Sequence, residues 1–180
     1  INEQYESVKA TVTENIVSNK INLSFNIEET ERFLVERINI YGNSITRENV
    51  IRNQLIIDEG DPYNEILAKK SINEIKSSNF FSDVKTEVVD GQDLNSKIIN
   101  ITVDEKPTGE IMAGAGFGTS GEVIEFSVRE NNYLGKGLGI DTAISLSSES
   151  IVGKFNVTNP NYNNTDKSIS VGLQALETDK

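Results

Sequence analysis

The sequence predicts an α+β module of order β-α-α-β-β followed by a purely antiparallel β-sheet. Helical periodicity is confined to two stretches that precede Lys106-Pro107-Thr108-Gly109. After that segment, short runs with every second residue apolar follow one another, separated by turns rich in Gly and Asn. The change of period at Pro107 therefore separates two kinds of structure.

The composition excludes several classes of function. The 180 residues include 28 acidic and 17 basic ones, a net charge of -11, which argues against a nucleic-acid partner. The absence of cysteine and histidine excludes disulfides, Ser-His-Asp triads and His-ligated zinc within the chain. We expect no cofactor and no metal. The acidic run Asp58-Glu59-Gly60-Asp61 lacks the alternating ligands of a calcium loop, and Gly135 to Gly139 lacks the strand-loop-helix context of a phosphate loop.

The sequence gives no sign of a helical membrane segment. No apolar run reaches about 18 residues, and Ile1 to Ala10 has neither the basic start nor the apolar core of a signal peptide. A membrane-spanning β-strand needs only about 10 alternating residues, so the low hydropathy leaves a membrane barrel open.

The first half contains one complete unit after an N-terminal pair of strands. Ser7 to Val12 and Lys20 to Ile27 read as strands around a turn at Ser18-Asn19. Two strands alone make a marginal sheet. Phe33 to Tyr41 is the next predicted strand, with one slip of its alternation at Arg37.

Two helices and two strands complete this unit. Thr46 is the predicted N-cap of the first helix, which carries Val50, Ile51 and Leu55 on one face, and Asn64 is the predicted N-cap of the second, which closes near Asn79. The two strands that follow are expected at 80–89 and 98–103.

The second half is predicted to be a meander of five strands with one apolar and one polar face. The expected strands are 110–119, 123–129, 138–146, 151–157 and 169–175. In a soluble protein the apolar face would form a core, and in a barrel it would face lipid. The alternation by itself leaves both interpretations open.

The first half resembles the POTRA domain, a periplasmic module repeated in front of outer-membrane barrels. The stretches that carry the resemblance are Phe33 to Ile40, Tyr41-Gly42-Asn43, the helix start at Thr46, Asn79-Phe80-Phe81 with Val84, and Ile101 to Glu105. The resemblance implies that residues 30–106 are the last POTRA domain. It also implies that residues 1–29 are the C-terminal hairpin of a preceding one.

The second half resembles the first four barrel strands of the BamA family of outer-membrane assembly factors. The matching stretches are Gly114 to Thr119, Asn131 to Gly137 and Val157 to Tyr162, and they occur in the same order as in the family. The resemblance implies that residues 109–180 are the first strands of an incomplete transmembrane β-barrel. It places the protein in a Gram-negative-type outer membrane, with its POTRA part in the periplasm.

The family resemblance implies that the first barrel strand is a weakly closed seam, where an unfolded outer-membrane β-barrel protein pairs by β-augmentation. In this chain the strand would be Ile111, Met112, Ala113, Gly114, Ala115, Gly116, Phe117 and Gly118. Three alternate glycines weaken a strand because they add backbone entropy and pack nothing. The competing interpretation is that these glycines relieve crowding or bend the sheet.

Two further contacts are implied by the resemblance. Glu59, followed by Gly60, matches an acidic residue that meets an arginine on an assembly lipoprotein such as BamD. The alternative is an ordinary solvated loop charge. A POTRA edge carrying Phe81, Val84 and Val88 would receive an unfolded client as an added strand. Which POTRA strand forms the exposed edge stays open.

The predicted function is that of a non-enzymatic insertase whose partners are unfolded barrel proteins, assembly lipoproteins and outer-membrane lipid. Two alternatives remain. One is a related POTRA-barrel protein for two-partner secretion or autotransporter assembly. The other is a soluble periplasmic binding module whose second half is a β-sandwich.

Overall fold

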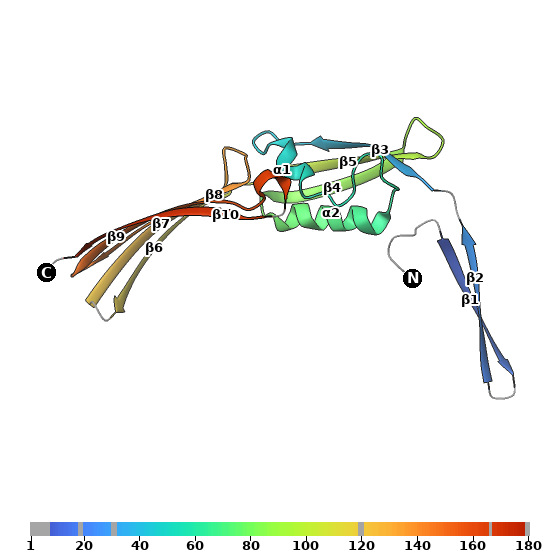
Figure 1. Ribbon diagram of the computed structural model, residues 1–180, viewed down its shortest axis with the longest axis horizontal. Coiled ribbons are helices and arrows are strands. Elements are labelled where there is room, and N and C mark those ends of the chain that lie inside the picture. The colour runs from blue at the N-terminus through green and yellow to red at the C-terminus, as the bar shows by residue number, and fades with distance from the viewer. Residues whose placement is uncertain (1–7, 18–19, 30–31, 119–120, 166, 179–180) are drawn as a thin grey trace. The chain divides into compact units, whose positions relative to one another are not determined.

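The computed structural model describes residues 8–17, 20–29, 32–118, 121–165 and 167–178, which form three sheets (Figure 1). Ser7, the predicted turn at Ser18-Asn19, and Thr119 with Ser120 lie outside the described residues.

The N-terminal sheet is a hairpin of β1 (Val8–Val17) and β2 (Lys20–Glu29). Val12 pairs with Phe25 and Ile16 with Ile21, so the apolar side chains gather on one face, and all four are exposed. Assignment of this hairpin to a preceding POTRA domain stays a prediction.

The second sheet has three strands and confirms the predicted order β-α-α-β-β. The elements are β3 (Leu34–Tyr41), α1 (Glu48–Arg52), α2 (Glu65–Ser77), β4 (Phe81–Asp90) and β5 (Ser96–Glu105). The strand order is β3-β5-β4, with β3 parallel to β5. The register of β3 shifts between Val35 and Arg37, where the alternation of the sequence slips.

The two predicted helix caps have opposite outcomes. The Asn64 side chain accepts a hydrogen bond from the Leu67 amide at 3.0 Å, which confirms it as the N-cap of α2. The prediction that Thr46 caps α1 is wrong. The N-cap residue of α1 is Arg47, and its side chain makes no capping hydrogen bond. The Thr46 side chain is buried, and its hydroxyl accepts a hydrogen bond from the Asn132 amide group instead. A long-range partner has replaced the local one.

The hydrophobic core of the described residues lies in the α+β part. Its buried apolar side chains are Val35, Ile38, Ile51, Ile57, Ala68, Ile75, Phe80, Phe81, Val84, Ile99, Ile101 and Val103. They come from both helices, all three strands and the segments that flank them.

The third sheet is an antiparallel meander of five strands in the order β10-β9-β8-β7-β6. Its strands are β6 (Gly109–Gly118), β7 (Gly121–Tyr133), β8 (Leu138–Ser147), β9 (Ser150–Asn159) and β10 (Ile169–Thr178), with a short 3-10 turn η1 (Tyr162–Asn164) before β10. Phe126 pairs with Ala113 on one side and with Ile144 on the other. The register therefore brings the apolar positions together on one exposed face, and among the described strands β6 and β10 each have a neighbour on one side only.

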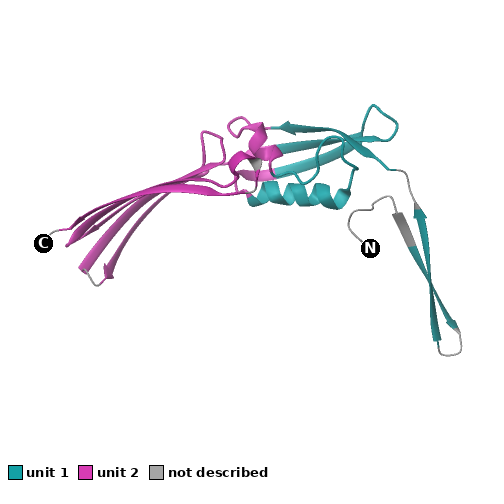
Figure 2. Ribbon diagram, viewed as in Figure 1, with its two compact units in different colours: residues 1–41, 54–77, 84–102 teal, residues 42–53, 78–83, 103–180 magenta. Residues whose placement is uncertain are grey.

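By compactness the chain forms two units (Figure 2). One unit contains residues 1–41, 54–77 and 84–102, and the other contains residues 42–53, 78–83 and 103–180. The predicted bounds at 30–106 and 109–180 remain a prediction based on element order. Among the described residues, neither helix has the length and apolarity required to cross a membrane.

Candidate functional site

β6 is an edge strand with a fully exposed surface. It pairs with β7 without interruption from Gly109, opposite Glu130, to Gly118, opposite Gly121, and no described strand pairs with its other side. Every residue of β6 is exposed. In an antiparallel strand alternate residues direct their N–H and C=O groups away from the existing partner, so β6 presents hydrogen-bonding groups for one more strand.

The three alternate glycines of β6, Gly114, Gly116 and Gly118, relieve no crowding among the described residues. A Cβ added to Gly114 or Gly116 would have no atom within 4 Å, and one added to Gly118 would meet only a Val123 methyl group at 3.9 Å. Neither Gly114 nor Gly116 has a positive φ. Neither crowding within this sheet nor a positive φ therefore explains Gly114 and Gly116, and their weakening of the strand stays a prediction.

A second edge lies in the α+β part, where β4 runs beside α2. The opposite edge, β3, is covered at its start: the Gly60 amide donates to the Val35 carbonyl at 2.7 Å, and the Val35 amide donates to the Asp61 carbonyl at 2.9 Å. Among the described backbone hydrogen bonds, no loop covers the edge of β4 in the way that residues 60–61 cover β3.

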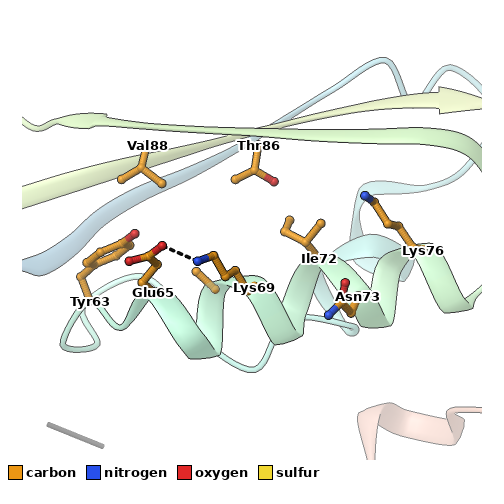
Figure 3. A pocket seen from close by; sticks show the side chains of 9 residues that line it. Tyr63, Glu65, Lys69, Ile72, Asn73, Lys76, Thr86 and Val88 are labelled. Carbon is orange, nitrogen blue, oxygen red and sulfur yellow. Dashed lines mark hydrogen bonds and ion pairs between the residues drawn. The ribbon is translucent and has the colours of Figure 1, made fainter. Parts of the chain in front are cut away.

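A groove of about 540 Å³ separates α2 from β4 (Figure 3). Its lining is Tyr63, Glu65, Ala68, Lys69, Ile72, Asn73, Lys76, Thr86 and Val88. Figure 3 shows Thr86 and Val88 pointing from the strand toward the helix, and Glu65 pairs with Lys69 at one end. The lining combines the apolar Ala68, Ile72 and Val88 with the basic Lys69 and Lys76 of the helix.

The structure divides the predicted edge residues. Phe81 and Val84 are 7% and 4% exposed and belong to the core, whereas Val88 lines the groove. Tyr63, Lys69 and Thr86 did not attract attention in the sequence, because helical and strand periodicities give no information on how two elements face each other.

Glu59 has a role within its own fold. One carboxylate oxygen accepts the Ile38 amide at 2.9 Å, next to the irregular register of β3. The Glu59 side chain is exposed, so its charge also reaches the surface. Its contact with a lipoprotein stays a proposal.

The turn between β7 and β8 is held against residues 45–50 by close backbone contact. The Arg47 amide donates to the Gly135 carbonyl at 2.9 Å, and a Cβ on Gly135 would lie 1.9 Å from the Ile45 carbonyl oxygen. Asn132 is buried, donates from its amide group to the Thr46 hydroxyl at 2.8 Å, and accepts the Gly137 amide at 2.7 Å. Both of these side-chain hydrogen bonds of Asn132 are made to groups within the protein, and together they hold the turn in place.

Glu105 organises the same region from the end of β5. Its carboxylate accepts the amides of Ile45 at 2.8 Å and Thr46 at 2.6 Å, and the hydroxyl of Ser44 at 3.0 Å. Burial acts to raise the pKa of Glu105, but the hydrogen bonds from Thr46, Ile45 and Ser44 together hold this pKa below its usual value. The carboxylate is therefore favoured in its charged form.

Comparison with known proteins places these features in context. Residues 33–106 match the family model of the POTRA domain, described as a surface antigen variable number repeat. The outer membrane protein assembly factor BamA of Neorickettsia risticii is 33% identical over 119 residues, which cover 64% of this chain and 16% of that protein. BamA of Neisseria meningitidis is 25% identical over 170 residues, 93% of this chain and 21% of that protein.

Solved structures show the same fold. The crystal structure of BamA from Haemophilus ducreyi lacking POTRA domains 1-3 superposes with a TM-score of 0.82 at 19% identity, over 97% of this chain and 34% of that one. CdiB from Escherichia coli gives 0.54 at 14% identity, over 87% of this chain and 30% of that one. The chain thus corresponds to a short section of each relative, one that contains a POTRA domain followed by barrel strands.

Proposed function

The chain belongs to the POTRA-plus-barrel family of outer-membrane assembly factors, and we propose that it assembles β-barrel proteins by pairing their strands with β6. The location is the outer membrane, with the POTRA domain in the periplasm. The relatives are named as assembly factors, and we propose a role without chemical catalysis for this chain also.

The exposed edge of β6 is the observation that carries this proposal. An incoming strand gains affinity from main-chain hydrogen bonds, so the side chains of clients need little in common. Each glycine in a strand interior costs about 0.5–1 kcal/mol relative to alanine. Gly114, Gly116 and Gly118 therefore keep β6 weak enough to exchange one neighbouring strand for another.

The groove between α2 and β4 is the proposed place where the POTRA domain receives an unfolded client. The backbone of β4 would add a strand, while Ile72, Thr86 and Val88 contact its side chains. A cysteine at Thr86, which faces the groove, should crosslink to a client carrying a thiol-reactive group. Glu87 is the matched control, since neighbouring residues of a strand point to opposite faces.

We further propose that Glu59 contacts a basic residue of an assembly lipoprotein. Its exposed carboxylate and its place in a loop between the helices support this proposal. Because the same carboxylate also holds the Ile38 amide, a variant must separate the charge from the hydrogen bond.

The test of the β6 proposal uses single cysteines, because these 180 residues contain none of their own. We would introduce Ala115→Cys in β6 and Ala175→Cys in β10, both on the apolar face of the sheet, in the natural protein that carries this sequence. Each variant is combined with a client barrel protein that carries one cysteine in its last strand and is arrested during insertion.

A disulfide with Ala115→Cys and none with Ala175→Cys is the expected result. Equal crosslinking at both positions, or crosslinking only at β10, would refute strand pairing at β6. The apolar face of the sheet disfavours the alternative of a soluble binding module, since Phe126, Ile144 and Phe155 are all exposed.

A further inference from the structure

Three exposed apolar residues gather where the strands meet residues 42–53. Ile45 is 69% exposed, Tyr133 is 43% exposed and Leu134 is 63% exposed. All three line one hollow of about 580 Å³, and the backbone contact between Gly135 and Ile45 brings the two segments together. We call Ile45, Tyr133 and Leu134 the junction patch.

The junction patch continues the apolar face of the five-stranded sheet. Tyr133 pairs with Leu138 across the sheet. Leu138 and Ile140 are alternate residues of β8 and therefore lie on the same face. Ile140 in turn pairs with Val157 on that face. A tyrosine at the end of a lipid-facing strand occupies the level at which aromatic residues gather in membrane barrels. The apolar surface then extends past the strand end to Leu134 and Ile45.

The conformation of Leu134 indicates that its exposure is imposed rather than incidental. Leu134 has φ of +53°, a left-handed conformation that leucine rarely adopts and that asparagine or glycine adopts more readily. The buried bonds of Asn132 on one side and the Gly135 contact on the other hold the turn in this form. An apolar side chain kept outward at a strained position suggests a function.

The charges around the patch fit a phospholipid surface. Arg47 and Lys136 are exposed and follow Ile45 and Leu134 by two residues each, although the chain as a whole carries a net charge of -11. The nearby carboxylates of Glu105 and Glu130 accept hydrogen bonds from the protein itself. Basic side chains beside apolar ones are typical of segments that lie at the lipid headgroup boundary.

We propose that the junction patch inserts into the headgroup boundary of the periplasmic leaflet, with Arg47 and Lys136 facing lipid phosphates. The proposal rests on the proposed function, because it requires the five strands to lie in the outer membrane. It adds that residues 44–47 of the POTRA domain also touch lipid, so that the membrane surface helps to hold this part of the domain at the base of the strands.

The test measures membrane depth with a nitroxide label on single cysteines. The labelled variants are Ile45→Cys and Leu134→Cys in the patch, Phe126→Cys on the apolar strand face, and Leu94→Cys in the loop between β4 and β5, where the leucine is fully exposed. The natural protein that carries this sequence, with any cysteine outside these residues replaced, is reconstituted in vesicles of phosphatidylethanolamine and phosphatidylglycerol. Collision of each label with oxygen, which enters lipid, is compared with collision with a water-soluble nickel chelate.

We expect labels at residues 45 and 134 to show a severalfold higher ratio of oxygen to nickel collisions than the label at residue 94. Two patch positions are used so that a folding defect in one variant leaves the other to decide. If both patch labels match residue 94 while residue 126 is shielded from nickel, the junction proposal is overturned and the membrane placement of the strands stands. If residue 126 is also open to nickel, the strands lie outside lipid, and both proposals are overturned.

Discussion

Replacement of Gly135 by alanine tests whether the β7–β8 turn is fixed by backbone contact. The new Cβ would lie 1.9 Å from the Ile45 carbonyl oxygen and 2.8 Å from its carbonyl carbon, far inside contact distance, and both are backbone atoms that cannot swing aside. The φ of Gly135 is +68°, a conformation that alanine adopts at a cost of about 1–2 kcal/mol.

The magnitude follows from what the turn loses when it moves away. The bond from the Arg47 amide to the Gly135 carbonyl contributes about 1 kcal/mol, and loss of the buried bond between Asn132 and Thr46 costs about 1–3 kcal/mol. With the backbone cost, we expect the contact to weaken by about 3–6 kcal/mol. This corresponds to an opening roughly two to four orders of magnitude more frequent.

Hydrogen exchange measured by mass spectrometry is the assay, on peptides that cover residues 42–53 and 131–138. The control is Gly153→Ala in β9, where an added Cβ has no atom within 4 Å and φ is not positive, so we expect unchanged exchange. If Gly135→Ala exchanges no faster than Gly153→Ala, the turn is not held by this contact, and the argument for the buried role of Asn132 is refuted.

Three other variants test the remaining assignments. The pKa of Glu105 lies below its ordinary value of 4.5. The stability that its charged carboxylate gives to the fold is therefore complete above pH 4.5 and is lost as the pH falls through the lowered pKa. Urea unfolding from pH 7 to pH 3 should show this loss of stability in the native protein and not in Glu105→Gln. Glu59→Gln should keep the hydrogen bond to the Ile38 amide and the melting temperature but weaken capture of the lipoprotein. Glu59→Ala should lower both the melting temperature and the capture. Normal capture by Glu59→Gln would exclude the charge contact. Gly116→Val should strengthen β6 by about 0.5–1 kcal/mol and so slow client insertion about two- to fivefold. The control Gly153→Val should leave the insertion rate unchanged. Equal insertion rates for the two variants would argue against a weak seam at β6.

The sequence was sufficient for the elements whose signals are local. The cap at Asn64, the slip in β3 and the five alternating strands follow from hydrogen bonds and side-chain periods within a few residues, and the structure confirms all of them. Likewise, the order β-α-α-β-β followed from local alternation, helix caps and turns, and Pro107 lies between β5 and β6, whereas the domain bounds stay a prediction.

The features that needed the tertiary structure depend on partners far apart in the chain. Thr46 looks like a helix cap in sequence, but its partner Asn132 lies 86 residues away, and the buried bond replaces the local one. Glu59 looks like a solvated charge until the Ile38 amide is placed beside it. The strands and helices could be predicted because a hydrophobic period or a helix cap depends on near neighbours in the chain. The groove beside β4 and the junction patch form only when separate segments pack against each other. The distance in space between those segments is not encoded by any spacing along the chain.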